Sequence, residues 1–371
     1  MIKNMKILDM KQRFYYLKIA AIFVVLLSSN QLFSQEQAIR AGSAGASELL
    51  INPFARSSGW GGSNVSSVSG LEGQYFNVAG LASTERTELI FTQTSWLQYG
   101  NELFNANESV SSISTFGFAQ KVGESGVMGM GVMSMNFGDI EITTVDMPDG
   151  GIGTFSPRFM NIGVSYAHIF SNSIQGGATI RMISEQISDV SANGIAFDAG
   201  IQYRTGEQDE LKFGISFKNW GPRMSFAGDG LSFRGIIPGG SDDDYKMTVE
   251  QRGSYFDLPA LFNIGMSYDI NLNNHRLTGA GTFTSNSFQK DQYRIGGEYS
   301  YKDYFMARTG FVYEEGVFNY DTRTTAVVGP TAGFTIELPM GNSGSTFGVD
   351  YSYRYTTPFK GCHAIGCRIN L

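Results

Sequence analysis

The feature that most constrains this 371-residue chain is a two-residue alternation that runs from Arg86 to the last residue. Near the carboxyl terminus, Phe347, Val349, Tyr351 and Tyr353 alternate with small or polar residues. Because successive side chains of an extended strand point to opposite faces, this period predicts strands with one apolar and one polar face. Such strands fit a soluble sandwich, whose apolar face points into a core, or a membrane barrel, whose apolar face meets lipid.

Segment lengths and connections decide between these two folds. The alternating segments are 86–98, 109–121, 125–138, 156–170, 174–186, 193–205, 210–220, 257–270, 275–286, 291–302, 304–315, 328–339, 345–356 and 360–371. Each is close to the ~10 residues that a tilted strand needs to cross a bilayer. Every second connection is a tight polar turn, whereas most of the others, 187–192 among them, are expected to be longer loops. This parity is typical of outer-membrane proteins, so the sequence predicts an all-β fold, a transmembrane antiparallel β-barrel of about 14 strands.

The composition agrees with a barrel whose wall faces hydrocarbon. Charged residues make up 16% of the chain and aromatic residues 13%, whereas soluble domains average about 25% charged residues. The formal net charge of −7 argues against a nucleic-acid partner. We therefore expect the lipid bilayer as surroundings and the outer membrane of a Gram-negative bacterium as the location.

The first 85 residues lack the strand pattern. Lys11, Arg13 and Lys18 precede an apolar run at 19–27, which is shorter than the ~20 residues of a transmembrane helix. This order of charged, apolar and small polar residues predicts a secretory signal peptide over 1–34. The Gly-, Ser- and Asn-rich stretch 35–85 shows no sustained period, and we expect it to be a plug or a periplasmic-mouth segment. The barrel is expected to span 86–371.

Two motifs in that stretch resemble a known family. Leu-Ile-Asn-Pro-Phe-Ala-Arg at 50–56, followed by Gly-Trp-Gly at 59–61, resembles the opening of PorV/PorQ family proteins. Asn-Val-Ala-Gly-Leu at 77–81 is similar to the step before the first strand of long-chain fatty-acid transporter barrels, the FadL-like superfamily. The resemblance implies fourteen strands and, for PorV/PorQ members, a role in type IX protein secretion. Phe54, Trp60 and Val78 depart from the family pattern, which indicates a divergent member.

The same motifs supply candidate residues for seating the plug. They are Pro53, Arg56, Gly59, Gly61 and Asn77. The proline ends the preceding stretch, and the glycines permit a positive φ where the chain turns back. The arginine is expected to need a buried carboxylate partner, for which Glu298, Asp350 and Asp198 are candidates.

The longest connection, 221–256, is a candidate contact surface for outer-membrane or cell-surface proteins. It combines aromatic and arginine side chains, which often anchor interfaces. The predicted partner-binding residues are Trp220, Arg223, Phe226, Phe233, Arg234 and Tyr245. Apolar groups in an extracellular loop favour a surface that another protein covers.

The sequence predicts neither an enzyme nor a metal or cofactor site. His168, His275 and His363 fall in or beside different strands without metal-ligand spacing. Charges of both signs lie on the predicted inner face, as expected of a lumen filled with paired charges. Cys362 and Cys367 are five residues apart on one predicted strand, hence ~16 Å apart and on opposite faces, so no disulfide between them is expected.

Two functions remain open from the sequence. The first is a non-enzymatic barrel that acts as a subunit or adaptor of a protein secretion or surface-assembly machine. The alternative is an outer-membrane transporter of hydrophobic solutes such as long-chain fatty acids. A transporter needs an apolar pocket under the loops and a gap or kink in the wall near the plug. The predicted inner positions hold few large apolar residues, which favours the adaptor.

Overall fold

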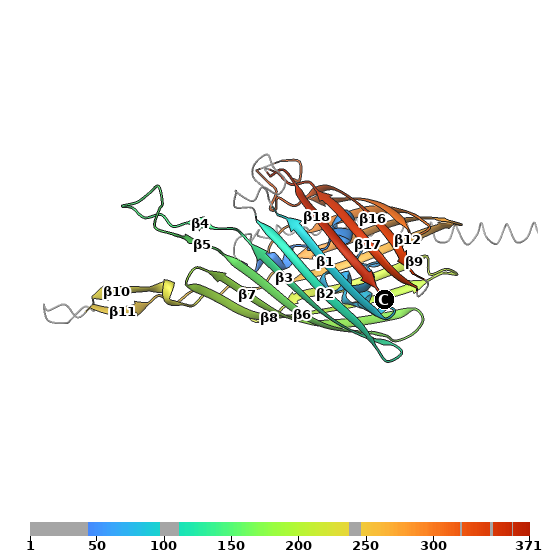
Figure 1. Ribbon diagram of the computed structural model, residues 1–371, viewed down its shortest axis with the longest axis horizontal. Helices are drawn as coiled ribbons and strands as arrows, with labels where there is room; N and C mark the ends of the chain where they lie inside the picture. The colour runs from blue at the N-terminus through green and yellow to red at the C-terminus, as the bar shows by residue number, and fades with distance from the viewer. Residues whose placement is uncertain (1–43, 97–110, 237–245, 320, 342–343, 358) are drawn as a thin grey trace, which may run out of the picture. The chain divides into compact units, whose positions relative to one another are not determined.

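A computed structural model describes residues 44–96, 111–236, 246–319, 321–341, 344–357 and 359–371. Its main element is a closed barrel of fourteen strands (Figure 1). The barrel strands are β1 Thr87–Ser95, β2 Ser112–Val122, β3 Gly126–Asn136, β6 Arg158–Ile169, β7 Ile174–Ile187, β8 Val190–Thr205, β9 Leu211–Trp220, β12 Leu261–Leu272, β13 His275–Asn286, β14 Gln292–Tyr301, β15 Phe305–Glu314, β16 Gly329–Met340, β17 Ser345–Arg354 and β18 Cys362–Asn370. Each overlaps one predicted segment, so the predicted fold class is confirmed.

Antiparallel pairing closes the barrel through its first and last strands. β1 pairs with β2 on one side and with β18 on the other, where Leu89 lies opposite Ile369. The alternation sorts side chains as the sequence predicts: Asp350 and Ser352 are buried, whereas Tyr351 and Tyr353 point to the opposite, outer face. No helix in the described ranges is long and apolar enough to cross a bilayer.

The connections differ between the two ends of the barrel, which we name the turn end and the loop end. Short hairpin turns, such as the one between β14 and β15, define the turn end. One connection at the loop end, predicted to be a longer loop over 187–192, is instead a two-residue turn, because Ile187 pairs with Val190 and Ser188 takes a φ of 49°. β7 and β8 are therefore longer than predicted, at 14 and 16 residues.

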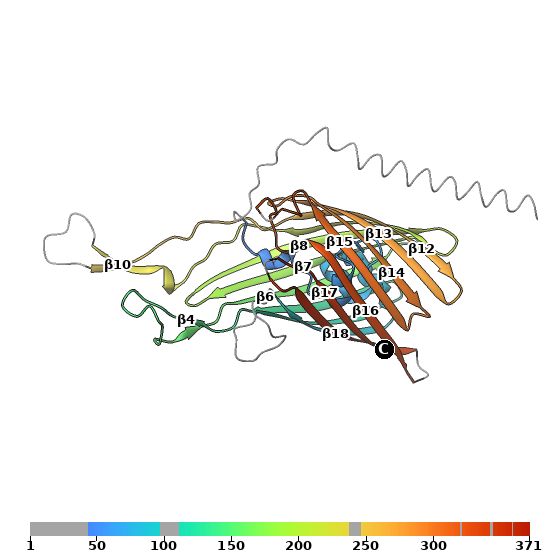
Figure 2. The ribbon, with the colours of Figure 1, turned by 90° about the horizontal axis from the view of Figure 1, so that it is seen from above.

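Two of the long connections contain small sheets of their own. Between β3 and β6, β4 (Ile140–Glu141) pairs with β5 (Thr154–Phe155). Between β9 and β12 lie η5 (Asp229–Leu231) and a hairpin of β10 (Ser232–Ile236) and β11 (Lys246–Glu250). Both small sheets project beyond the barrel strands at the loop end (Figures 1 and 2). The stretch predicted as one irregular loop is therefore partly a β-ribbon.

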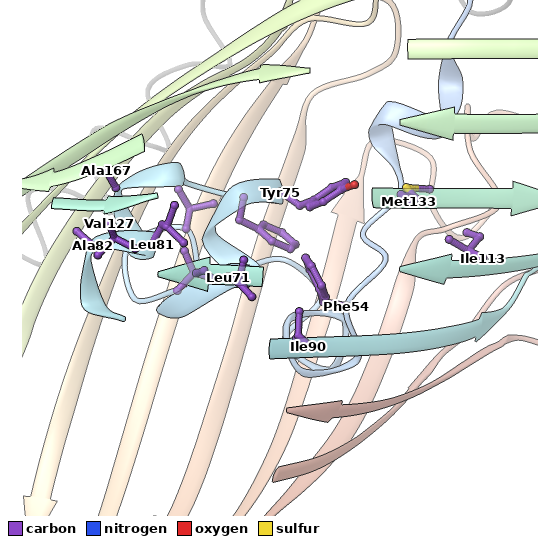
Figure 3. Packing of buried hydrophobic residues seen from close by; sticks show 14 of the residues in the cluster. Phe54, Leu71, Tyr75, Leu81, Ala82, Ile90, Ile113, Val127, Met133 and Ala167 are labelled. Carbon is purple, nitrogen blue, oxygen red and sulfur yellow. The ribbon is translucent and has the colours of Figure 1, made fainter. Parts of the chain in front are cut away.

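Residues 44–85, which we call the luminal segment, contact opposite walls of the barrel. The segment contains η2 (Ser47–Leu50), α2 (Ala55–Gly59), η3 (Gly70–Tyr75) and η4 (Val78–Ser83). α2 contacts β15 to β18, whereas η4 contacts β3 and β6 to β8. Phe54, Leu71, Tyr75 and Leu81 pack with inward side chains such as Ile90 of β1 (Figure 3). The hydrophobic core of this barrel thus lies inside its lumen.

The two cysteines and three histidines occupy the wall. Cys362 is buried on the inner side of β18 and Cys367 lies on its outer side, so the two form no disulfide with each other, as predicted. A ring nitrogen of each histidine, His168, His275 and His363, forms a hydrogen bond of 2.8 to 3.2 Å with a tyrosine hydroxyl on the outer face. Aromatic and imidazole rings of this kind suit the boundary between hydrocarbon and water.

Candidate functional site

Asn77 fastens the luminal segment to the wall. Its side-chain amide donates to the carbonyl of Val65 at 3.1 Å and to that of Ile201 in β8 at 3.0 Å. Its Oδ1 accepts from the backbone amide of Ala79 and thereby caps η4. A Cβ at Gly200 would lie 2.0 Å from this oxygen, so a glycine is needed opposite the asparagine.

The glycines of the first motif lie against β15 and β16. The carbonyl of Gly59 accepts from Thr331 Oγ1 at 3.0 Å, and Gly61 has a φ of 63°, which favours glycine. The carbonyl of Trp60 approaches β15 so closely that a Cβ at Gly310 would lie 2.3 Å from it. Inward-facing glycines of the strands therefore form the seat of the luminal segment.

Pro53 and Arg56 differ in their burial and in their contacts. Pro53 is buried, and its carbonyl accepts from Thr94 Oγ1 at 3.5 Å. Arg56 is half-buried beside two cavities of about 170 and 350 Å³ toward the turn end. Among the described residues it forms no ion pair. Instead, it stabilises the ionised form of buried Glu72, although desolvation dominates and raises the pKa of that carboxyl to about 7.

The three carboxylates predicted to pair with Arg56 contact other groups. Asp198 pairs with Arg181 at 2.9 Å. Glu298 pairs with Arg308, whose side chain is fully buried, and with Arg276. Asp350 accepts a hydrogen bond from Thr335. The predicted partners of Arg56 are therefore wrong, because side chains on neighbouring strands, arginines for Asp198 and Glu298 and a threonine for Asp350, reach these carboxylates across the sheet.

Most luminal charges in the middle and toward the turn end are paired. Besides the pairs of Asp198 and Glu298, Lys212 pairs with Asp269 at 2.6 Å and Arg368 with Glu337 at 2.8 Å. These pairs join neighbouring or next-neighbouring strands. The charged residues of both signs on the predicted inner face therefore pair with each other, as the sequence indicated.

A cavity of about 440 Å³ lies on the loop-end side of the luminal segment, and we call it the loop-end cavity. Much of its lining is large and apolar: Leu50, Ile51, Phe76, Trp96, Met135, Phe137, Phe159, Leu261, Val312 and Val327. The rings of Phe137 and Phe159 meet edge to face with centroids 5.0 Å apart. The expectation of an interior with few large apolar residues is therefore wrong at this end.

Two arginines give the cavity a cationic side. Arg354 Nη2 donates to Ser58 Oγ at 2.7 Å, and its guanidinium lies 5.9 Å from the centre of the Trp96 ring. Arg294 Nη2 donates to Gln292 Oε1 at 2.8 Å, whereas its buried Nε has no hydrogen-bond partner in the described part of the chain. The two guanidinium groups repel each other. No carboxylate of the described residues forms an ion pair with either arginine.

One carboxyl group also lines the cavity. Burial, and secondarily the charge of Glu185, raise the pKa of Glu48 to about 8. Glu48 is therefore mostly uncharged at neutral pH and does not neutralise Arg294 or Arg354. Apolar walls beside two uncompensated cations suit an amphipathic anion.

The wall is irregular beside the luminal segment. The register of β8 against β9 shifts between Phe197 and Ala199, so that two residues of β9, Lys218 and Asn219, lie opposite Asp198 in a bulge. Asn219, with a φ of 58°, donates its backbone amide to Asp198 Oδ1 at 2.7 Å. Arg181 links the bulge to the luminal segment, because it also lies 4.3 Å from the ring centre of Tyr75. The pairing of the barrel strands is therefore irregular at a place where the luminal segment contacts the wall.

The five predicted partner-binding residues that the structure describes lie in different surroundings. Trp220 ends β9 on the outer face, where its ring lies 6.2 Å from that of Phe197. Arg223 pairs with Asp257 at 2.7 Å at the surface. Phe226 packs against Phe256 and a buried cluster instead of pointing into solvent. Phe233 and Arg234 lie in β10, and Tyr245 lies outside the described residues.

Comparison with known proteins supports the fold. No protein-family model matches the chain, and no curated protein sequence matches it at a significant level. Solved structures of a channel and a transporter do match. A monoaromatic hydrocarbon channel, CymD, is 12% identical with a TM-score of 0.53, over 86% of this chain and 97% of that one. The Ralstonia pickettii toluene transporter TbuX is 13% identical with a TM-score of 0.51, over 86% and 97%. At these identities the likeness shows the barrel fold alone.

Several residues of the cavity were missed by the sequence interpretation. Trp96, Phe137 and Phe159 lie at or beyond the ends of β1, β3 and β6, but they continue the inner-face positions of these strands, so the alternation could have identified them. Met133 and Met135 likewise place large apolar side chains on the inner face of β3. Glu48 stands in a segment without a sustained period, so no pattern indicated it.

Proposed function

We propose that the protein is an outer-membrane transporter for hydrophobic solutes that carry an anionic group, such as long-chain fatty acids. The observation that carries this proposal is the loop-end cavity, with aromatic and aliphatic walls beside Arg294 and Arg354. A carboxylate there would supply the ion-pair partner that Arg294 and Arg354 lack among the described residues. The structural neighbours are named as hydrocarbon channels and toluene transporters, which is consistent with an apolar solute.

The lumen toward the turn end is a poor route for such a solute. The cavities beside Arg56 are lined largely by charged and polar side chains, including Arg204, Lys212 and Glu298. Transferring an apolar tail into these polar, water-accessible spaces forgoes the hydrophobic stabilisation available in the cavity or in lipid. We propose that the solute leaves sideways between β8 and β9 around Asp198, where strand pairing is already irregular.

A pair of matched ligands tests the anionic part of the proposal. The purified barrel is expected to bind a long-chain fatty acid more tightly than the fatty alcohol of the same chain length. Arg294→Met and Arg354→Met should each weaken acid binding by roughly 10- to 100-fold, the effect of losing a hydrogen bond to a charged group. Binding of the alcohol should change little.

The exposed Arg234 of β10 supplies the control, because Arg234→Met leaves the cavity untouched. If the parent protein bound the acid and the alcohol with equal affinity, the anionic group would be wrong. If it bound neither ligand, the transporter proposal itself would be wrong.

One observation favours the adaptor as a second candidate. In the β10–β11 ribbon, Phe233 lies opposite Val249, next to Met247, and all three side chains are exposed. We infer that an outer-membrane or cell-surface protein, as in a PorV/PorQ-like type IX secretion machine, could cover this apolar face. Excision of 224–250 should then leave a folded barrel that no longer co-purifies with the partner. Retention of every partner by the excised barrel would rule out this surface.

A further inference from the structure

η2 forms part of the wall of the loop-end cavity on the side of the long loops. Ser47, Glu48 and Leu50 line the cavity, whereas Leu49 is buried in a separate cluster with Ile183 of β7. The backbone amide of Gly45 donates to a carbonyl in the β9–β12 connection at 3.3 Å. Displacement of this short element would open the cavity toward the loop end.

A pair of buried carboxyl groups lies where η2 meets the barrel wall. Glu48 of η2 is 2% exposed and Glu185 of β7 is 4% exposed. Among charged residues, Glu185 acts on Glu48 most strongly. Neither carboxyl oxygen of Glu48 has a hydrogen-bond partner in the described part of the chain. Two buried carboxyl groups that repel each other when charged cannot both ionise without a large electrostatic cost.

We propose that Glu48 and Glu185 form a proton-dependent latch that holds η2 against β7 and so closes the loop-end cavity. While one proton is shared, the two carboxyl groups attract each other, and Leu49 stays buried. When both groups are ionised, they repel each other, and η2 moves away from β7. The latch would regulate the solute site proposed above, and in that sense it rests on the proposed function.

The direction of the pH effect follows from the change in burial. Burial, and then the charge of Glu185, raise the pKa of Glu48 from 4.5 to about 8 while η2 is seated. When η2 is displaced, Glu48 meets water and regains its ordinary pKa. The closed arrangement is therefore most stable below pH ~4.5 and loses that advantage as the pH rises to about 8.

Other charged groups near the latch face it from the cavity and from the loop. Arg294 of β14 and Arg354 of β17 line the same cavity as Glu48. Asp257, paired with Arg223, accepts the hydrogen bond from Gly45 through its backbone carbonyl. Asn161 of β6 is the polar uncharged neighbour of Glu48. Neither arginine forms an ion pair with Glu48 or Glu185 among the described residues.

Cysteine labelling without any solute tests the latch. In the full-length barrel carrying Cys362→Ala and Cys367→Ala, Leu49→Cys reports displacement of η2. Ser47→Cys, at an exposed position of the same turn, reports the intrinsic reactivity of a thiol at each pH. The ratio of the labelling rate at position 49 to that at position 47 should rise by at least about tenfold between pH 5.5 and pH 8.5, equivalent to about one pKa unit.

Charge-removing variants decide whether the pair causes that rise. Glu48→Gln and, independently, Glu185→Gln should abolish the pH dependence of the ratio, whereas Glu207→Gln, an exposed carboxyl at the turn end, should leave it intact. Heat-modifiable migration on gels verifies that each variant is folded. A ratio that stays constant with pH, or that rises equally in both Gln variants, would overturn the latch. Because no solute is present, this outcome is independent of whether the protein binds fatty acids.

Discussion

The lumen has two regions that treat charge in opposite ways. Toward the turn end, Arg308, Arg276 and Glu298 form a buried network, and Arg368 pairs with Glu337. At the loop end, Arg294 and Arg354 lie in a mostly apolar cavity, and neither forms an ion pair with a described residue. The charges of these turn-end pairs are neutralised within the chain, whereas the two loop-end arginines leave positive charge for a ligand to neutralise.

This difference indicates where binding is possible. A buried ion pair already offsets its own desolvation penalty, so an incoming charged group gains little there. An uncompensated buried cation carries that penalty until an anion arrives. The luminal segment separates the two regions, since α2 and η4 contact opposite walls.

Removal of the luminal segment should have the largest effect, because it merges the two regions. Deletion of 45–80 removes η2, α2, η3 and half of η4 together with the core that includes Phe54 and Leu71. The single-channel conductance in planar bilayers should rise severalfold, because the deleted residues fill the lumen between opposite walls. Excision of 232–250, the β10–β11 ribbon that projects beyond the barrel, is the control and should leave the conductance unchanged. Unchanged conductance in a folded deletion barrel would show that these residues do not block the lumen.

Loss of one member of the turn-end network should have the next largest effect. Arg308→Met leaves Glu298, with 4% of its side chain exposed, paired only with the half-buried Arg276. The unfolding free energy in urea should fall by about 3 to 5 kcal/mol. Arg223→Met, which removes a pair whose arginine is 68% exposed, should cost less than about 1 kcal/mol. If the two variants lose the same stability, the turn-end charges are not compensated as the structure indicates.

The fold could be predicted almost completely from the sequence because strand period, strand length and loop parity are local properties. The failure at 187–192 is instructive. Ser188 adopts a positive φ and closes a two-residue hairpin, although neither Ser188 nor Asp189 is a glycine or asparagine. A turn without its usual residues gave no signal in the sequence.

The candidate site could be predicted only in part, because it depends on contacts between distant segments. The motif at 77–81 indicated Asn77, and its side chain does form a hydrogen bond with the backbone of β8. The partner of Arg308 could not be read from one strand, since it depends on the pairing of β14 with β15. The aromatic wall at Trp96, Phe137 and Phe159 forms only after the strand ends converge on the luminal segment.

The smallest effect, and the one that sharpens the comparison most, concerns Arg294. Arg294→Met removes a half-buried cation that is repelled by Arg354 and that is bonded directly to Gln292 rather than to a carboxylate. Because the desolvation penalty disappears with the charge, the unfolding free energy should stay constant or increase by up to about 1 kcal/mol. Unfolding in urea, followed by tryptophan fluorescence, measures this change beside that of Arg308→Met. The two substitutions, on the neighbouring strands β14 and β15, would then differ in their effect on the unfolding free energy: Arg308→Met lowers it, whereas Arg294→Met does not. If Arg294→Met instead destabilises the barrel as much as Arg308→Met does, the loop-end charge is compensated within the chain, and the reason for an anionic solute disappears.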